Sequence, residues 1–198
     1  MKTPIAVFKS NSYAEQVALI GIQKILSEYP VDEFFSVRDS ADSAFSINLT
    51  LIGGWPEEPT QIPAFIVVAL IRKVERAGLM ANPYYNEVNG VSQFVQFFIG
   101  TGTYTFTLQA HSYDFLYKMQ SYFNYILTSK DFFDFLVKNG ISPTSNYLTW
   151  TNPSQRTYST LKYHLMSCNM DFRVEFVNGY TDDSGDLINE VVSIGEKE

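Results

Sequence analysis

Residues 104–128 read YTFTLQAHSYDFLYKMQSYFNYILT and contain the clearest structural pattern in the chain. The first seven residues alternate apolar and polar side chains, which is typical of a strand that buries one face. Ser112 then stands where a helix N-cap is favoured, and apolar residues follow at helical spacing as far as Thr128. The stretch therefore predicts a strand that runs directly into an amphipathic helix.

A second alternating stretch lies at residues 170–176, where Met, Phe, Val and Phe alternate with Asp, Arg and Glu. We expect this strand to end at Asn178-Gly179, because that dipeptide favours tight turns. The preceding residues, 158–167, form either a separate strand or the first part of one long bent strand. A last strand is expected over the mostly apolar run 187–194.

Toward the N-terminus, Ser12 and Glu15 have the spacing of a capping box and predict a helix that ends near Glu28, before Pro30. A half-buried strand is expected over 45–51. The break at Gly53-Gly54 and a proline-bearing loop from Trp55 to Pro63 follow this strand.

In the middle of the chain, residues 64–71 are apolar throughout and predict a central strand covered on both faces. An irregular stretch over 78–91 follows. We expect strands 94–99 and 103–111 to form a hairpin that turns at Gly100-Thr101-Gly102. A short helix over 131–138 should end at Asn139-Gly140.

These elements predict an α+β fold, in which two or three helices cover a mixed or antiparallel β-sheet with long irregular loops. The 198 residues include 45% hydrophobic and 18% charged residues, which is the composition of a folded protein. Neither a repeat nor a linker divides the chain, so a single domain over 1–198 is expected.

Charge and cysteine content exclude several classes of protein. The net charge is −7, and the closest group of cations is Arg72, Lys73 and Arg76 beside Glu75, which argues against tight binding to nucleic acid. Cys168 is the sole cysteine, so no disulfide forms within the chain. The longest apolar run is far shorter than the ~20 residues of a membrane span, and we expect synthesis in a cytoplasm without membrane contact.

Catalytic and metal-binding motifs are absent. His164 and Cys168 share a predicted strand, where four residues separate side chains by more than ~10 Å, too far for a nucleophile and its base. The acidic residues at 182–186 lack the order of a calcium loop. We therefore predict no enzyme activity, no catalytic residue, no metal site and no cofactor.

Aromatic residues make up 16% of the chain, more than one core of this size needs. Tyr and Phe are enriched where subunits meet, although an aromatic-rich core explains the surplus about as well. Three aromatic residues in predicted loops, Trp55, Tyr84 and Tyr85, are candidate interface anchors. Packing within the loops themselves is the alternative for each.

The stretch Tyr104–Leu127 resembles the strand-then-helix segment of bacteriophage tail completion proteins, which include tail terminators and the sheath-stabilising terminators of contractile tails. In that group the helix often has an acidic residue in its first turn, here Asp114. Residues 170–180 resemble the group's final long strand, and Pro63 with 64–71 resembles another of its strands.

This resemblance implies a virion structural protein made in the host cytoplasm. Such proteins form a homo-oligomeric ring, commonly a hexamer, that caps the tail tube and joins tail to head. Its partners would be tail tube, sheath or neck proteins, and DNA would pass through the lumen without specific binding. Two alternatives stay open: a cytoplasmic small-molecule-binding or regulatory α+β domain, and an enzyme whose site is assembled from dispersed carboxylates.

Overall fold

The structure is a computed structural model of the chain. It describes residues 2–7, 10–28, 50–56, 63–76, 84–88, 91–145, 147–158 and 161–182. Side chains of 2–7, 76, 84–88, 91–97 and 176–182 are not described. Residues 45–49 of the predicted strand 45–51, and the whole predicted strand 187–194, lie outside the described residues.

The chain divides into two compact units. Unit 1 comprises Met1–Lys9, Lys73–Gly100 and Val174–Glu198, and unit 2 comprises Ser10–Arg72 and Thr101–Arg173. Three long strands, β3 (Ala64–Arg76), β5 (Val91–Ala110) and β8 (Leu161–Asp182), contribute residues to both units. The expectation of a single domain stays a prediction.

In unit 1, two shorter strands pair with β5 and β8. Strand β1 (Lys2–Val7) runs antiparallel to β8, with Val7 opposite Val177. Strand β4 (Tyr84–Val88) runs antiparallel to the start of β5, with Val88 opposite Val91. Only two residues separate Val88 from Val91, so β4 and β5 form a tight hairpin.

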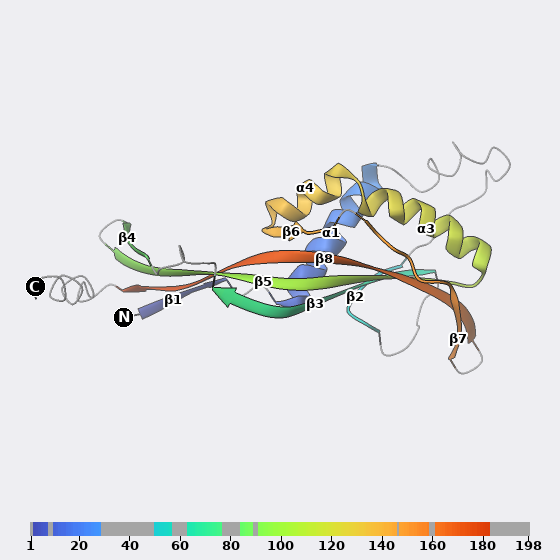
Figure 1. Cartoon of the computed structure of the whole chain (residues 1–198), viewed down its shortest axis with the longest axis horizontal. Coiled ribbons are helices and arrows are strands. Elements are labelled where there is room, and N and C mark those ends of the chain that lie inside the picture. The colour runs from blue at the N-terminus through green and yellow to red at the C-terminus, as the bar shows by residue number, and fades with distance from the viewer. Residues whose placement is uncertain are drawn as a thin grey trace, which may run out of the picture. The chain divides into compact units, whose positions relative to one another are not determined.

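In unit 2, the strands lie in the order β8-β5-β3-β2 (Figure 1). Strand β2 (Thr50–Gly53) pairs in parallel with the start of β3, whereas β7 (Ser154–Tyr158) pairs antiparallel with the start of β8. A short strand, β6 (Ile141–Pro143), also pairs with β8. The sheet is therefore mixed, as the fold class predicted.

The described helices are α1 (Asn11–Glu28), α3 (Tyr113–Leu127) and α4 (Lys130–Lys138), and all three cover one face of this sheet. The hydroxyl of Tyr104 on β5 donates to the carbonyl oxygen of Ala14 on α1 at 2.8 Å. Phe65 on β3 stacks on Phe123 of α3 with ring centroids 3.9 Å apart. The α+β prediction is confirmed.

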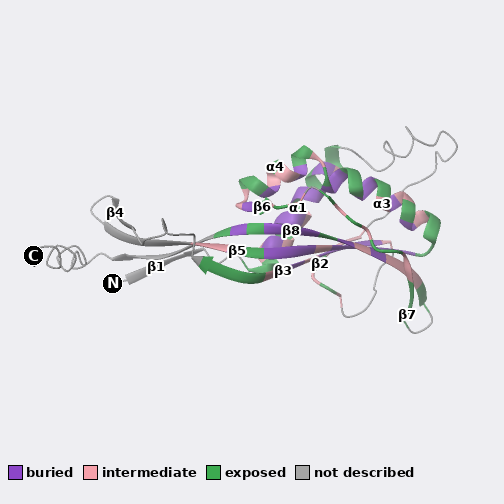
Figure 2. Cartoon of the chain, viewed as in Figure 1, coloured by how far each residue is buried: buried purple, intermediate pink, exposed green. Residues whose placement is uncertain are grey.

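The core lies between these helices and the sheet. Each strand supplies alternate residues to it: Tyr104, Phe106 and Leu108 of β5, and Met170 and Phe172 of β8, are buried. On the helices the buried residues recur at helical spacing, so that one side of each is buried and the other exposed (Figure 2). Thr107 and Gln109, on the other side of β5, are buried as well.

The predicted capping box at Ser12 and Glu15 is wrong. The helix begins two residues earlier than predicted, because Ser10 and not Ser12 caps it: the hydroxyl oxygen of Ser10 accepts the backbone N–H of Tyr13 at 3.1 Å. Glu15 turns to β3 instead, where its carboxylate accepts the N–H of Ala69 at 3.0 Å. The predicted end of the helix at Glu28 is confirmed.

Two predicted turns are also wrong. Gly100-Thr101-Gly102 does not turn the chain, because β5 runs through it as one strand. Gly102 is needed for close packing: a Cβ there would lie 2.6 Å from Cζ of Phe172. Asn178-Gly179 does not end its strand either, because both residues pair with β1 and β8 continues to Asp182.

Three further expectations are resolved by strand bounds and burial. The open alternative of one long strand is confirmed from Leu161 on, because β8 runs to Asp182, whereas Tyr158 belongs to β7. The stretch 78–91 is not irregular throughout, because it contains β4. Strand β3 is covered on both faces at 64–67, but Leu70 is exposed.

Candidate functional site

On the sheet face away from the helices, hydroxyl and carboxamide side chains connect β5 to β8. The hydroxyl of Thr103 donates to Oδ1 of Asp171 at 2.7 Å, and that of Thr105 to Oδ1 of Asn169 at 3.0 Å. One step along, the Thr107 and Ser167 hydroxyls lie 2.8 Å apart. Side chains on a strand alternate between faces, so these threonines point away from Tyr104 and Phe106.

The exposed end of this ladder opens into a depression of about 330 Å³. Arg72 of β3 and Arg173 of β8 line it from two strands that have β5 between them. The lining consists of Arg72, Thr101, Gly102, Thr103, Thr144, Asp171, Phe172 and Arg173. Every one of these residues belongs to unit 2.

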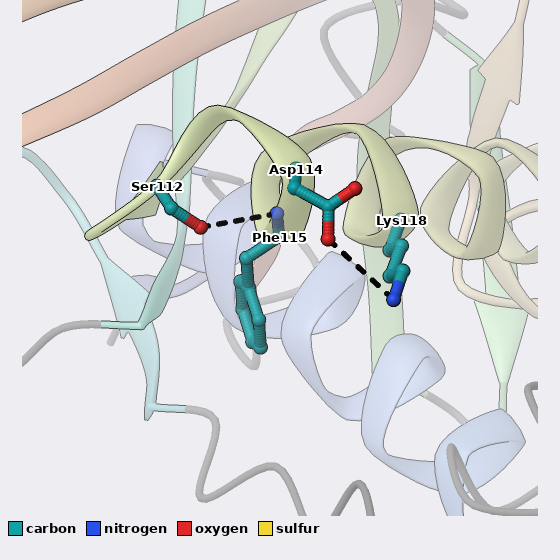
Figure 3. Close-up of polar contacts among 4 residues, drawn as sticks. All are labelled: Ser112, Asp114, Phe115 and Lys118. Carbon is teal, nitrogen blue, oxygen red and sulfur yellow. Dashed lines mark hydrogen bonds and ion pairs between the residues drawn. The ribbon is translucent and has the colours of Figure 1, made fainter. Parts of the chain in front are cut away.

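At the junction of β5 and α3, short polar contacts fix the start of the helix (Figure 3). The hydroxyl oxygen of Ser112 accepts the N–H of Phe115 at 3.3 Å, as the sequence predicted for an N-cap. Asp114 stands in the first turn and forms an ion pair with Lys118 at 3.5 Å. A carboxylate here interacts favourably with the positive end of the helix dipole.

Partly exposed tyrosines follow one another along α3 at multiples of four residues. Tyr113, Tyr117 and Tyr125 are 44%, 51% and 45% exposed, and Ser121 occupies the intervening position. We call these three side chains the tyrosine row. The opposite side of the helix is packed on the core through Met119 and Phe123, so the row stands on a firmly held helix.

The Cys168 thiol and one ring nitrogen of His164 are buried rather than presented to a ligand. Burial raises the pKa of the Cys168 thiol, and no disulfide involves it. His164 stacks on Tyr113 with ring centroids 3.8 Å apart, and its Nδ1 is buried with no hydrogen-bond partner in the described part of the chain. In that same part, no three His, Cys, Asp or Glu residues lie together as a metal site would require.

The predicted interface residues fall in different places. Trp55 follows β2 and is 58% exposed, which suits an interface anchor. Tyr84 and Tyr85 lie on strand β4 rather than on a loop, and their side chains are not described. Trp55 belongs to unit 2 and the two tyrosines belong to unit 1.

Sequence reasoning missed both surfaces described above. The tyrosine row had a signal: tyrosine at 113, 117 and 125 occupies the side of the helix where charged residues are usual. The depression had no signal in the sequence. Arg72 and Arg173 are about a hundred residues apart, and only the pairing of β3 and β8 with β5 brings them to the same surface.

No model of a known protein family matches this chain, and no curated protein matches it. Among the described residues, no helix is long and apolar enough to span a membrane.

Proposed function

We propose that this chain is a structural subunit of a bacteriophage tail or neck. Copies would form a ring, in the group most often a hexamer, that caps the tail tube and joins it to the head. Its partners would be further copies and the tube, sheath or neck proteins, and its location the virion. The resemblance of Tyr104–Leu127 to tail completion proteins suggests this assignment.

The observation that carries the proposal is the tyrosine row. Tyrosine side chains offer large contact areas with two rotatable bonds, and they are enriched at the centres of protein interfaces. Tyr117 and Tyr125 are about half exposed on a helix whose other side is buried. A second copy or a tail protein would cover them at little cost in conformational entropy, because the helix is already ordered.

Charge supports a role in which DNA passes without binding. A chain with net charge −7 repels phosphate over its surface as a whole. In unit 1, Lys73 of the Arg72, Lys73 and Arg76 group is paired with Glu75. We therefore expect no measurable binding of duplex DNA by the isolated chain at physiological salt.

The alternative is a cytoplasmic small-molecule-binding or regulatory domain. The observation that favours it is the depression beside Arg72 and Arg173. Its volume of about 330 Å³ is at the lower end of the range for ligand pockets. Such pockets are lined mainly by apolar and aromatic side chains, whereas six of the eight lining residues here are polar or charged. The ring is therefore the stronger proposal.

Light scattering after size-exclusion chromatography tests the tyrosine row. The wild-type chain should elute as a species several times heavier than 22.6 kDa. Tyr117→Gln with Tyr125→Gln keeps helix propensity and should weaken association by about thirtyfold or more, since an interface hot spot contributes about 2 kcal/mol.

The matched control is Tyr147→Gln, which changes the most exposed tyrosine of the described residues, at 88%, on a segment outside α3. It should leave the mass unchanged. Unchanged circular dichroism of the double variant shows that it is folded. An assembled mass equal to that of the wild type in the double variant would refute the role of the row.

A further inference from the structure

We propose that the depression between Arg72 and Arg173 binds an acidic peptide segment of another protein chain. This goes beyond the ring proposal, because it assigns a ligand class to a surface that the tyrosine row does not include. Every residue that lines the depression belongs to unit 2.

Two guanidinium groups stand at the depression without an ion-pair partner in the described part of the chain. Arg72 lies on β3 and Arg173 on β8, and β5 separates them. Neighbouring strands are ~4.8 Å apart, so the two backbones are about 10 Å apart. At that separation both long arginine side chains can contact the same carboxylate from opposite sides. Alternatively, each arginine can contact one of two neighbouring carboxylates.

The floor is organised by Asp171. Its Oδ1 accepts the Thr103 hydroxyl at 2.7 Å, and its backbone carbonyl oxygen accepts the N–H of Thr144 at 2.8 Å. Asp171 therefore has a fixed position beside Thr103, and with the two arginines it gives the depression a net charge of +1. The hydroxyl of Thr101 remains in the lining as a further polar contact.

This arrangement favours a carboxylate over other ligands. Guanidinium binds a carboxylate through two parallel hydrogen bonds, which gives geometric specificity as well as attraction. Nucleic acid needs many cations along its backbone, whereas here two arginines share the site with the Asp171 carboxylate. An extended peptide also brings backbone amide groups to the threonine hydroxyls, which an isolated anion does not.

Fluorescence anisotropy with a labelled hexaglutamate peptide and the full-length chain tests the site. Binding should weaken as salt rises. Arg72→Gln and Arg173→Gln should each weaken it by about five- to tenfold, as expected for charge-assisted contacts at an exposed site. The matched control is Arg156→Gln on β7, an exposed arginine outside the depression, which should change binding less than about twofold.

A gain-of-binding variant guards against trivial loss of folding. Asp171→Asn keeps an acceptor for Thr103 and removes the negative charge from the floor, so it should tighten peptide binding by about two- to fivefold.

Three results would overturn the proposal: no binding up to about 1 mM peptide, equal binding by all variants, or tighter arginine-dependent binding of a duplex DNA oligonucleotide. Any of these with an intact oligomer would refute the peptide site and leave the ring proposal standing.

Discussion

The carboxylate of Glu15 on α1 accepts the backbone N–H of Ala69 on β3 at 3.0 Å, across 54 positions of the sequence. Asn11, one helical turn earlier, accepts the N–H of Ile71 at 2.9 Å. Strand β2 pairs with β3 only over residues 64–67 of β3. Beyond the end of β2, the side chains of Glu15 and Asn11 accept the next N–H groups of β3. The helix thereby satisfies an edge that would otherwise present unpaired N–H groups.

We predict that Glu15→Ala lowers the free energy of unfolding by about 1–2 kcal/mol, because the Ala69 N–H loses its acceptor. Glu15→Gln keeps an acceptor oxygen and should cost about half as much. Urea denaturation followed by circular dichroism measures both. Gln16→Ala, at the exposed neighbouring position, should change stability by less than about 0.5 kcal/mol; an equal loss there would contradict the account.

Gly102→Ala should destabilise the protein by about 2 kcal/mol or more. The new Cβ would lie 2.6 Å from Cζ of Phe172 and 2.8 Å from the carbonyl oxygen of Leu70, and the second of these is backbone that cannot move aside. Thermal unfolding measures the loss.

Gly53→Ala on β2 is the control for that substitution. Its Cβ would lie 2.9 Å from the far end of the flexible Leu19 side chain and at an ordinary contact distance of 4.0 Å from Cβ of Glu15. Gly53→Ala should lower stability clearly less than Gly102→Ala. A larger loss of stability for Gly53→Ala would show that β5 does not need a glycine at position 102 for close packing.

Leu108→Asp and Phe172→Asp should each prevent folding. Both side chains are buried beneath the helices, where an unpaired carboxylate costs several kcal/mol to desolvate. Thr101→Asp places the same charge on an exposed position of β5, beside arginines, and should be tolerated. Soluble expression and thermal unfolding distinguish the two core variants from Thr101→Asp. Unfolding of either core variant near the wild-type midpoint would contradict the buried positions of Leu108 and Phe172.

Stability should fall at alkaline pH. Burial, and to a smaller extent the nearby Tyr13 and Glu15, raises the pKa of Tyr104 above its ordinary value near 10. Above about pH 10 the unfolded chain releases this proton while the folded chain keeps it, so stability is complete below that pH and declines above it, by at most ~1.4 kcal/mol per pH unit.

Denaturation measured from pH 8 to 11 tests this in a Cys168→Ala background, because the buried thiol contributes a decline of the same sign. Tyr104→Phe should lower stability at neutral pH, because Ala14 loses its hydrogen-bond donor, but it should flatten the alkaline decline. A decline as steep in Tyr104→Phe as in its parent would contradict the assignment.

Local patterns in the sequence predicted the elements that depend on local chemistry. Ser112 and Asn139-Gly140 mark the start of α3 and the end of α4, because capping involves residues three or four positions apart. Alternation over 104–110 likewise predicted which side chains of β5 enter the core.

The errors arose where distant residues decide the conformation. The local pattern around Gly102 predicts a turn, but the ring of Phe172, seventy positions away, requires a glycine in a continuous strand. Asn178-Gly179 stays extended because β1 pairs with it. Glu15 contacts β3 rather than its own helix. None of these partners is visible in a local pattern.

Native mass spectrometry of the purified full-length chain tests the ring most directly. A subunit whose contacts close on themselves gives one discrete assembly, whereas open contacts give a continuing series. We predict a single species at an integral multiple of 22.6 kDa, most simply six copies. A spectrum containing only the 22.6 kDa chain, or an unbroken series of masses, would contradict the proposal.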